Sequence, residues 1–502
     1  MFSNNIFSIV LFLCVVSSTT LTGQDKYDYV WLFSNNGGPG EGNEATLLDF
    51  NGGKLTIDSF NIGNEMGLNN TSFSNDAGEL LLYSNACAIY DSTFQVADNG
   101  HDINPGEIHD IWCQFGEYPS NSNSIFLEDP AGTGVYFIHK NIVNTPTDIT
   151  LPDLMYSYIQ YDDLKVIKKN VKIDSIRNKI SGYMEAIRHQ NEIDWWLVDY
   201  TVSEDSGYML KFLLDSIGIS LVEQEEFVNQ ASLGNSTCSA GGQSCFSPDG
   251  TKYVKFCPQS GLDVFDFDRA TCEFTNYKNI SVPGIPDDFF SGVAMSPSGR
   301  FVYISNRTKL VQVDLIAENP ADQILLIDIY DGFIDPFPTN FSYMQIGPDC
   351  RIYMTSTNGV RSLHVINNPD EKGAACNFVQ RGLKLRDSNS PASIPNHPVF
   401  RLDGDEVCDP TITNVFDIPV KVVYDLDIYP NPTSDVVSVS FPDDLRNGML
   451  YVRSLDGQVL HQQSIGYAGS LRTSLTDYEG GIYIIEIVSK HRHFVGRVVK
   501  VD

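Results

Sequence analysis

The sequence predicts an all-β protein: a β-propeller of six to eight blades, with seven the favoured count, followed by a small C-terminal β-sandwich. Three observations predict this fold class. Short runs rich in Val, Ile, Tyr, Phe and Leu alternate with clusters of Gly, Asn, Asp and Pro, which is the pattern of strands and turns. The pattern repeats about every fifty residues. The composition then changes near Cys408. Convincing helical periodicity is absent, and Met184–His189 is the one short candidate for a helix.

The repeat is clearest in three turns, 246–250, 295–299 and 346–350, which read FSPDG, MSPSG and IGPDC. Their spacings are 295 − 246 = 49 and 346 − 295 = 51 residues. Each has Pro where φ must be near −65°, and two of the three end in Gly, which tolerates positive φ. We therefore expect each turn to join the innermost strand of a blade to the next strand.

Weaker copies begin at Phe73, Phe126 and Ile187, and a further strand pair, 29–34 and 45–50, precedes them. The chain then has six clear units and a seventh. Four short strands in roughly 40–50 residues are typical of a propeller blade. An array of Ig-like domains would need about 100 residues per repeat, so the ring is the better interpretation.

The domain organisation follows from both ends of the chain. The apolar run Ile6–Val16 followed by small residues predicts a signal peptide over 1–23, and it is too short to span a bilayer. We expect the propeller over 24–410, a linker over 411–423 and a separate domain over 424–502, with no transmembrane segment.

The net charge of -31 repels phosphate backbones, so nucleic acid is not expected as a partner. A cation, a sugar or a basic protein surface stays open. The simplest interpretation is that the acidic surface keeps an exported protein soluble.

Removing Cys14 with the signal peptide leaves 10 − 1 = 9 cysteines, so at least one has no partner within the chain. An exported chain can form disulfides. Positions on the same rim of the ring give three candidate pairs: Cys87–Cys113, Cys238–Cys257 and Cys350–Cys376. A Cys257–Cys272 bond is not expected, because a strand separates the two residues.

The densest polar cluster could hold a divalent cation, and it consists of His101, Asp102, Glu107, His109 and Asp110. A solvated acidic loop is the simpler interpretation. Glu185, with Arg188 and His189, could line the central channel, although a structural ion pair is the simpler role. No nucleotide-binding, P-loop or zinc-protease motif is present, so we expect no organic cofactor and assign no catalytic residues.

Two functional hypotheses remain. The first is a secreted or cell-surface propeller that acts as a binding module for an extracellular protein or glycan. The second is an extracellular hydrolase or lyase that acts on a polymer, with its active site in the central funnel. The first is favoured because no convergent polar set is visible in the sequence.

The C-terminal eighty residues resemble the type A sorting domain of type IX secretion cargo. The resemblance rests on YPNP at 429–432, DGQVL at 456–460, GGIYIIEI at 480–487 and a terminal lysine. It implies export by the type IX machinery, as a partner, to the medium or the outer cell surface. The motif residues that it singles out are Pro430, Asn431, Pro432, Gly457, Gly480, Gly481, Tyr483 and Lys500.

The preceding domain is similar to a recurrent group of secreted Bacteroidota propellers. The similarity lies in VWLFSNN at 30–36, ATLLDF at 45–50, ELLLYS at 79–84, NGH at 99–101, CNF at 376–378 and SIPN at 393–396. It implies the fold and the location, and it supplies no reaction.

Overall fold

The structure, a computed structural model, describes residues 26–34, 44–63, 65–144, 149–176, 179, 181–203, 206–227, 242–284, 290–319, 323–385, 393–402, 407–414, 423–441, 448–454, 459–465, 469–488 and 493–501. The predicted signal peptide lies outside these residues. The chain divides into two compact units, 1–414 and 415–502. No helix in the described part of the chain has the length and apolar character that a membrane span needs.

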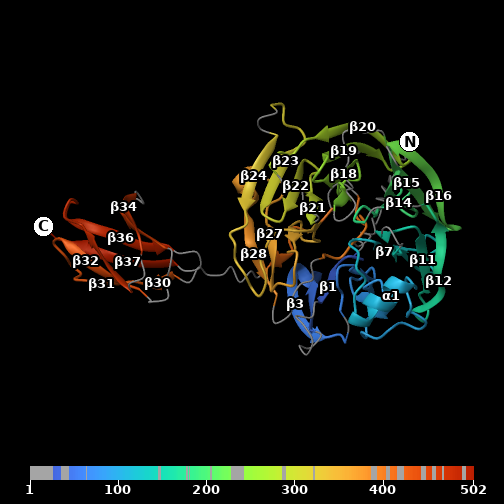
Figure 1. Ribbon diagram of the computed structural model, residues 1–502, viewed down its shortest axis with the longest axis horizontal. Coiled ribbons are helices and arrows are strands. Elements are labelled where there is room, and N and C mark those ends of the chain that lie inside the picture. Colours follow the sequence, from blue (N-terminus) through green and yellow to red (C-terminus); the bar gives the residue numbers. More distant parts are fainter. Residues whose placement is uncertain are drawn as a thin grey trace, which may run out of the picture. The chain divides into compact units, whose positions relative to one another are not determined.

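The described residues of the first unit form seven successive blades (Figure 1), with sheet orders β1-β2-β3-β29, β4-β5-β6, β7-β8-β11-β12, β13-β14-β15-β16, β17-β18-β19-β20, β21-β22-β23-β24 and β25-β26-β27-β28. Their strands are β1 (Val30–Ser34), β2 (Glu44–Asp49), β3 (Lys54–Asn61), β4 (Thr71–Ser74), β5 (Leu80–Ser84), β6 (Ile89–Asp91), β7 (Ser124–Glu128), β8 (Gly134–Lys140), β11 (Leu154–Gln160), β12 (Lys165–Asp174), β13 (Glu185–Arg188), β14 (Trp195–Ser203), β15 (Ser206–Asp215), β16 (Gly218–Phe227), β17 (Gln243–Phe246), β18 (Lys252–Cys257), β19 (Gly261–Asp268), β20 (Glu273–Ile280), β21 (Ser291–Met295), β22 (Phe301–Asn306), β23 (Lys309–Asp314), β24 (Ile324–Ile329), β25 (Met344–Ile346), β26 (Ile352–Met354), β27 (Ser362–Ile366), β28 (Phe378–Lys384) and β29 (Thr413–Asn414). A small hairpin, β9 (Val143–Asn144) with β10 (Ile149–Thr150), is inserted in the third blade. The prediction of a propeller, with seven as the favoured count, is confirmed.

The predicted repeat turns follow the first strands of three blades. The residue that ends each turn has a positive φ: 69° at Gly250, 68° at Gly299 and 65° at Cys350. Glycine reaches this region without steric cost, which explains its use in two of the turns. The first strands of the blades are therefore placed at the spacing that the sequence predicted.

Apolar residues between neighbouring blades form the core. Val254 and Phe256 of β18 lie in one buried cluster with Val302 and Ile304 of β22. A single blade leaves both of its faces open, whereas packing against the next blade removes them from water.

The ring closes between its first and last blades. The Trp31 ring lies 5.6 Å from the Tyr353 ring of β26, centroid to centroid. The short strand β29 adds to the outer side of β3 in parallel, pairing Thr413 with Lys54. Residues from both ends of the first unit thus complete the first blade.

The predicted helix at Met184–His189 is wrong. Glu185–Arg188 is the innermost strand β13, and all four of its residues are buried. A short run that is buried on both faces does not show strand alternation, so its pattern resembles that of a buried helix. The described α-helix is instead α1 (Glu107–Trp112), followed by a 3-10 turn, η2 (Cys113–Phe115), between β6 and β7.

The second unit consists of two described sheets that enclose one apolar core. Val437, Val439, Leu450, Val452 and Ile485 are fully buried in it. Its strands are β30 (Val423–Asp425), β31 (Asp427–Tyr429), β32 (Val436–Ser440), β33 (Met449–Arg453), β34 (Val459–Ser464), β35 (Ser470–Ser474), β36 (Gly481–Val488) and β37 (His493–Lys500).

Candidate functional site

The residues predicted as a metal site lie close together in the chain, but the structure does not bring them into one ligand set. His101 Nδ1 is 2.6 Å from Asp102 Oδ2, and His109 Nδ1 is 3.4 Å from Asp110 Oδ1. Glu107 is exposed at the start of α1. Among the described residues, no three His, Cys, Asp or Glu side chains are grouped so that they could hold a metal ion.

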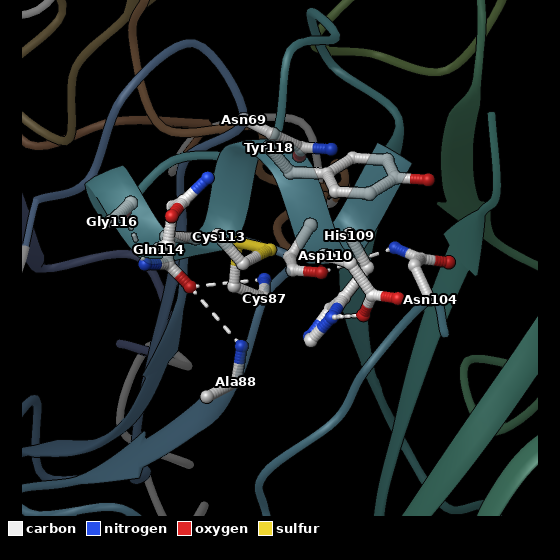
Figure 2. The surroundings of a disulfide bond; sticks show 12 residues. Asn69, Cys87, Ala88, Asn104, His109, Asp110, Cys113, Gln114, Gly116 and Tyr118 are labelled. Carbon is white, nitrogen blue, oxygen red and sulfur yellow. Dashed lines mark hydrogen bonds and ion pairs between the residues drawn. A yellow bond between two sulfur atoms is a disulfide. The ribbon is translucent and has the colours of Figure 1, made fainter. Parts of the chain in front are cut away.

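The same segment carries a rigidly held helix. A disulfide joins Cys113, at the end of α1, to Cys87, between β5 and β6 (Figure 2). Ile108 of the helix packs with Tyr118 and Ile142 in a small buried cluster. The helix is thereby fixed to the blade on its inner side.

Large apolar side chains at the end of this helix and in η2 are exposed. Ile111, Trp112 and Phe115, which we call the aromatic ridge, are 43%, 39% and 63% exposed. Side chains three and four positions apart lie on one side of a helix, so Phe115 shares a side with the other two. Large side chains gathered at the surface in this way are typical of interaction sites.

The remaining disulfides correct one predicted pair. Cys350 bonds to Cys408, with their Cα atoms 5.1 Å apart, and Cys376 is a free, buried cysteine. The reason is that the chain returns to the Cys350 turn, where the Asp409 amide donates to the Pro348 carbonyl at 2.7 Å. Sharing a rim did not give Cys350 and Cys376 the required proximity.

The other predicted pairings involve the fifth blade. Cys257 is disulfide-bonded, and its partner is not among the described residues. Cys238, its predicted partner, lies outside them as well. Cys272 is a free cysteine.

Residues 393–402 run through the centre of the ring. The Asn396 carbonyl accepts from Thr71 Oγ1 at 2.8 Å, and its side-chain amide donates to the Ser124 carbonyl at 3.1 Å. The Val399 amide donates to the Ala186 carbonyl at 3.0 Å. This central segment therefore contacts the innermost strands of the second, third and fourth blades.

Aromatic packing holds the central segment in place. The Phe400 ring lies 5.4 Å from Tyr27 and 5.5 Å from Trp195, centroid to centroid. His397 Nε2 is 3.0 Å from Ser72 Oγ. Burial lowers the pKa of His397 to about 4, so its imidazole is neutral at pH 7.

A cavity of about 60 Å³ remains between the central segment and the inner strands β13, β17, β21 and β25. Glu185 and Cys245 line it. Burial raises the pKa of the Glu185 carboxyl well above its usual range, and burial with the nearby Glu185 raises the pKa of the Cys245 thiol. A cavity of this size has room for a few water molecules.

Glu185, Arg188 and His189 do not act together. Arg188 Nη2 donates to Glu128 Oε2 at 2.6 Å, and its guanidinium lies 4.0 Å from the centre of the Trp195 ring. His189 Nε2 is 3.2 Å from the Ala270 carbonyl. Glu185 alone faces the cavity. The structural ion pair expected for Arg188 exists, with a different partner.

The predicted sorting motif gathers along one strand of the second unit. The Asn431 side chain donates to the Arg497 carbonyl at 2.7 Å and accepts from the Val499 amide at 2.9 Å. In the same sheet Gly481 pairs with Lys500. Pro430 and Pro432 flank Asn431, and Tyr483 Oη donates to the Glu479 carbonyl at 2.7 Å, whereas Gly457 lies outside the described residues.

Some residues of these sites escaped prediction. The aromatic ridge was missed because its helix was not expected. The central segment was missed because it pairs with residues more than two hundred positions away. Lys140 and Asp199 form a buried ion pair that the sequence does indicate, because each is a charged residue in a strand of mostly apolar residues.

Comparisons with known proteins identify the second unit. Residues 427–501 match the family described as the secretion system C-terminal sorting domain. None of the curated proteins matches the chain significantly.

Several solved structures are similar at low identity. A protein from Lactobacillus plantarum is 16% identical, covering 73% of this chain and 97% of that chain, with a TM-score of 0.42. A putative 6-phosphogluconolactonase from Bacteroides uniformis is 12% identical, covering 74% and 98%, with a TM-score of 0.40. PorZ, a surface component of the type-IX secretion system of Porphyromonas gingivalis, is 10% identical, covering 92% and 68%, with a TM-score of 0.29. All three TM-scores are below 0.5.

The sheet topology defines an all-β propeller protein. Its residues 427–501 belong to the secretion system C-terminal sorting domain family, as the sequence motifs predicted. The chain is cargo of the type IX system, which carries it to the cell surface or the extracellular space.

Proposed function

We propose that this protein is a secreted binding module that recognises an extracellular ligand, a protein or a glycan, through the aromatic ridge. The observation that carries the proposal is the exposure of Ile111, Trp112 and Phe115 on one short helix. The Cys87–Cys113 bond keeps that helix ordered before a ligand arrives. A surface that is already ordered loses less conformational entropy on binding.

The central segment supports binding over catalysis in the funnel. Residues 393–402 occupy the centre of the ring, and the cavity beside them is about 60 Å³. A polymer chain needs a far larger opening, since small-molecule sites alone typically measure about 300–1,000 Å³. The hydrolase or lyase alternative would need this segment to leave.

The proposal is tested by screening the secreted protein against glycan and extracellular-protein arrays, and then comparing variants on each ligand found. Trp112→Ala with Phe115→Ala should weaken binding at least tenfold, about 1.4 kcal/mol. Ile217→Ala is the matched control, because Ile217 is 94% exposed in the turn between β15 and β16. Unchanged affinity in the ridge variant, or an equal loss in the control, would contradict the proposal.

A further inference from the structure

Lys140 and Asp199 form a fully buried ion pair between two blades. Lys140 is the last residue of β8 in the third blade, and Asp199 lies within β14 of the fourth. Lys140 Nζ is 2.8 Å from Asp199 Oδ1, and both side chains are 0% exposed. Burying two charges carries a desolvation cost, which their attraction only partly offsets.

The surroundings favour the uncharged amine. Burial lowers the pKa of Lys140, and the nearby Lys179 ammonium lowers it further, while the attraction of Asp199 opposes both. Lys179 Nζ is itself held by Asp174 Oδ1 at 2.6 Å. The Lys140 amine is thus closer to being a nucleophile than an exposed lysine is.

A second buried acid, Glu185, lies on the other face of the same sheet. Glu185 on β13 is paired in register with Val198, and successive residues of a strand point to opposite faces, so Glu185 and Asp199 face different blades. Burial raises the pKa of the Glu185 carboxyl well above its usual range, and the Lys140 charge opposes that shift. No hydrogen-bond partner of Asp199 Oδ2 is found within the described ranges. A buried oxygen without a partner gains from an acidic proton.

We propose that Lys140 and Asp199 condense into an isopeptide bond that joins the third and fourth blades. The 2.8 Å hydrogen bond carries one proton from Lys140 Nζ to Asp199 Oδ1, which leaves an amine and a carboxylic acid. The nitrogen lone pair attacks Cγ, and the new Nζ–Cγ bond forms. A second proton passes from Nζ to Oδ1, the Cγ–Oδ1 bond breaks, and water leaves.

The balance of this reaction is complete. An ammonium and a carboxylate become an amide and one water molecule, with no oxidant, reductant or other reactant. Two buried charges are replaced by a neutral amide, which removes the desolvation cost of the pair.

A second buried pair in the same molecule serves as a matched control. Lys255 Nζ is 3.0 Å from Asp263 Oδ2, and the two side chains are 1% and 0% exposed. Here the Lys255 ammonium lies 4.5 Å from the ring centre of Tyr200 and 5.3 Å from that of Tyr183. Burial lowers the pKa of Lys255, but Asp263 and the two tyrosines outweigh burial and raise it. The control lysine stays an ammonium and cannot attack.

The experiment is intact-mass and peptide mass spectrometry of the full secreted chain after complete reduction. The protein should be lighter than its sequence by one water molecule. Its protease digest should contain a branched peptide that joins Lys140 to Asp199, while Lys255 and Asp263 appear in unbranched peptides. Lys140→Arg should restore the full mass, because a guanidinium cannot form this amide.

Two results would overturn the proposal. One is a wild-type chain of full mass in which Lys140 and Asp199 are recovered in separate peptides. The other is a branched peptide at Lys255 and Asp263 with none at Lys140. Both measurements use the wild-type protein, so they do not depend on whether a variant folds.

Discussion

Arg401 Nη2 donates to Asp28 Oδ2 at 2.7 Å, and this ion pair joins residues 373 positions apart. The two side chains are 11% and 10% exposed, so the pair is nearly buried. Asp28 lies two residues before β1, and Arg401 lies near the end of the central segment. The pair therefore ties the returning chain to the start of the ring.

Replacing Arg401 should destabilise the propeller. Arg401→Met removes the cation and leaves the Asp28 carboxylate buried without its partner, which costs about 3–5 kcal/mol. Urea unfolding followed by circular dichroism measures the change. Lys252→Met is the control, because Lys252 and Asp266 are 32% and 42% exposed, and such a pair contributes less than about 1 kcal/mol. Equal losses of unfolding free energy in the two variants would show that the Arg401–Asp28 pair stabilises the fold no more than an exposed pair does.

The Cys350–Cys408 bond should stabilise the closed ring. It spans 58 residues, and cross-links of this kind contribute about 2–4 kcal/mol by restricting the unfolded chain. Cys408→Ser should lower the unfolding free energy by that amount. The double variant Cys350→Ser/Cys408→Ser should lose no more than the single variant. A clearly larger loss in the double variant would mean that Cys350 contributes in some other way.

Acid should weaken the fold through its buried histidines. Burial lowers the pKa of His139 to about 3 from 6.5. Below pH 6.5 His139 binds a proton in the unfolded chain but stays neutral in the folded chain. The free energy of unfolding therefore falls as the pH falls from 6.5 toward 3. At pH 5 this residue alone should cost about 2 kcal/mol.

His139→Gln tests this pH dependence, because glutamine keeps hydrogen-bonding capacity toward Asn104 without titrating. The variant should show a shallower loss of stability between pH 6.5 and 4. His101→Gln changes an exposed ring and should follow the wild-type curve. Identical slopes in wild type and His139→Gln would contradict the prediction.

Removing residues 424–502 should abolish export and leave the propeller folded. The sorting family match covers 427–501, and the residues that close the ring all precede 415. Cell fractionation should find the truncated chain retained inside the cell envelope, with cooperative unfolding like that of the full chain. Normal amounts of truncated protein in the medium would refute the sorting role of this domain.

Local signals carried most of the fold prediction. The turns at 246–250, 295–299 and 346–350 identified the first strands, because turn chemistry depends on neighbouring residues only. The helix α1 could not be predicted from the sequence, because its 6 residues are too few to display a helical period. The Cys350–Cys408 bond could not be deduced either, because sequence does not determine which cysteines meet.

The candidate sites were less predictable than the fold. The polar cluster around His101 attracted attention by composition, but composition does not tell whether side chains converge. Thr71 meets Asn396 across 325 positions, and no local pattern encodes such a contact.

The late position of the central segment bears on when this protein can fold. Blade one receives its outer strand from Thr413 and Asn414, and the middle of the ring receives residues 393–402. Pairings over such distances slow folding, because a long loop must close before they form. The ring therefore cannot be completed until residues 393–414 have been synthesised. We expect the native state to form after synthesis is complete, on the far side of the inner membrane, shortly before the sorting domain is presented for export.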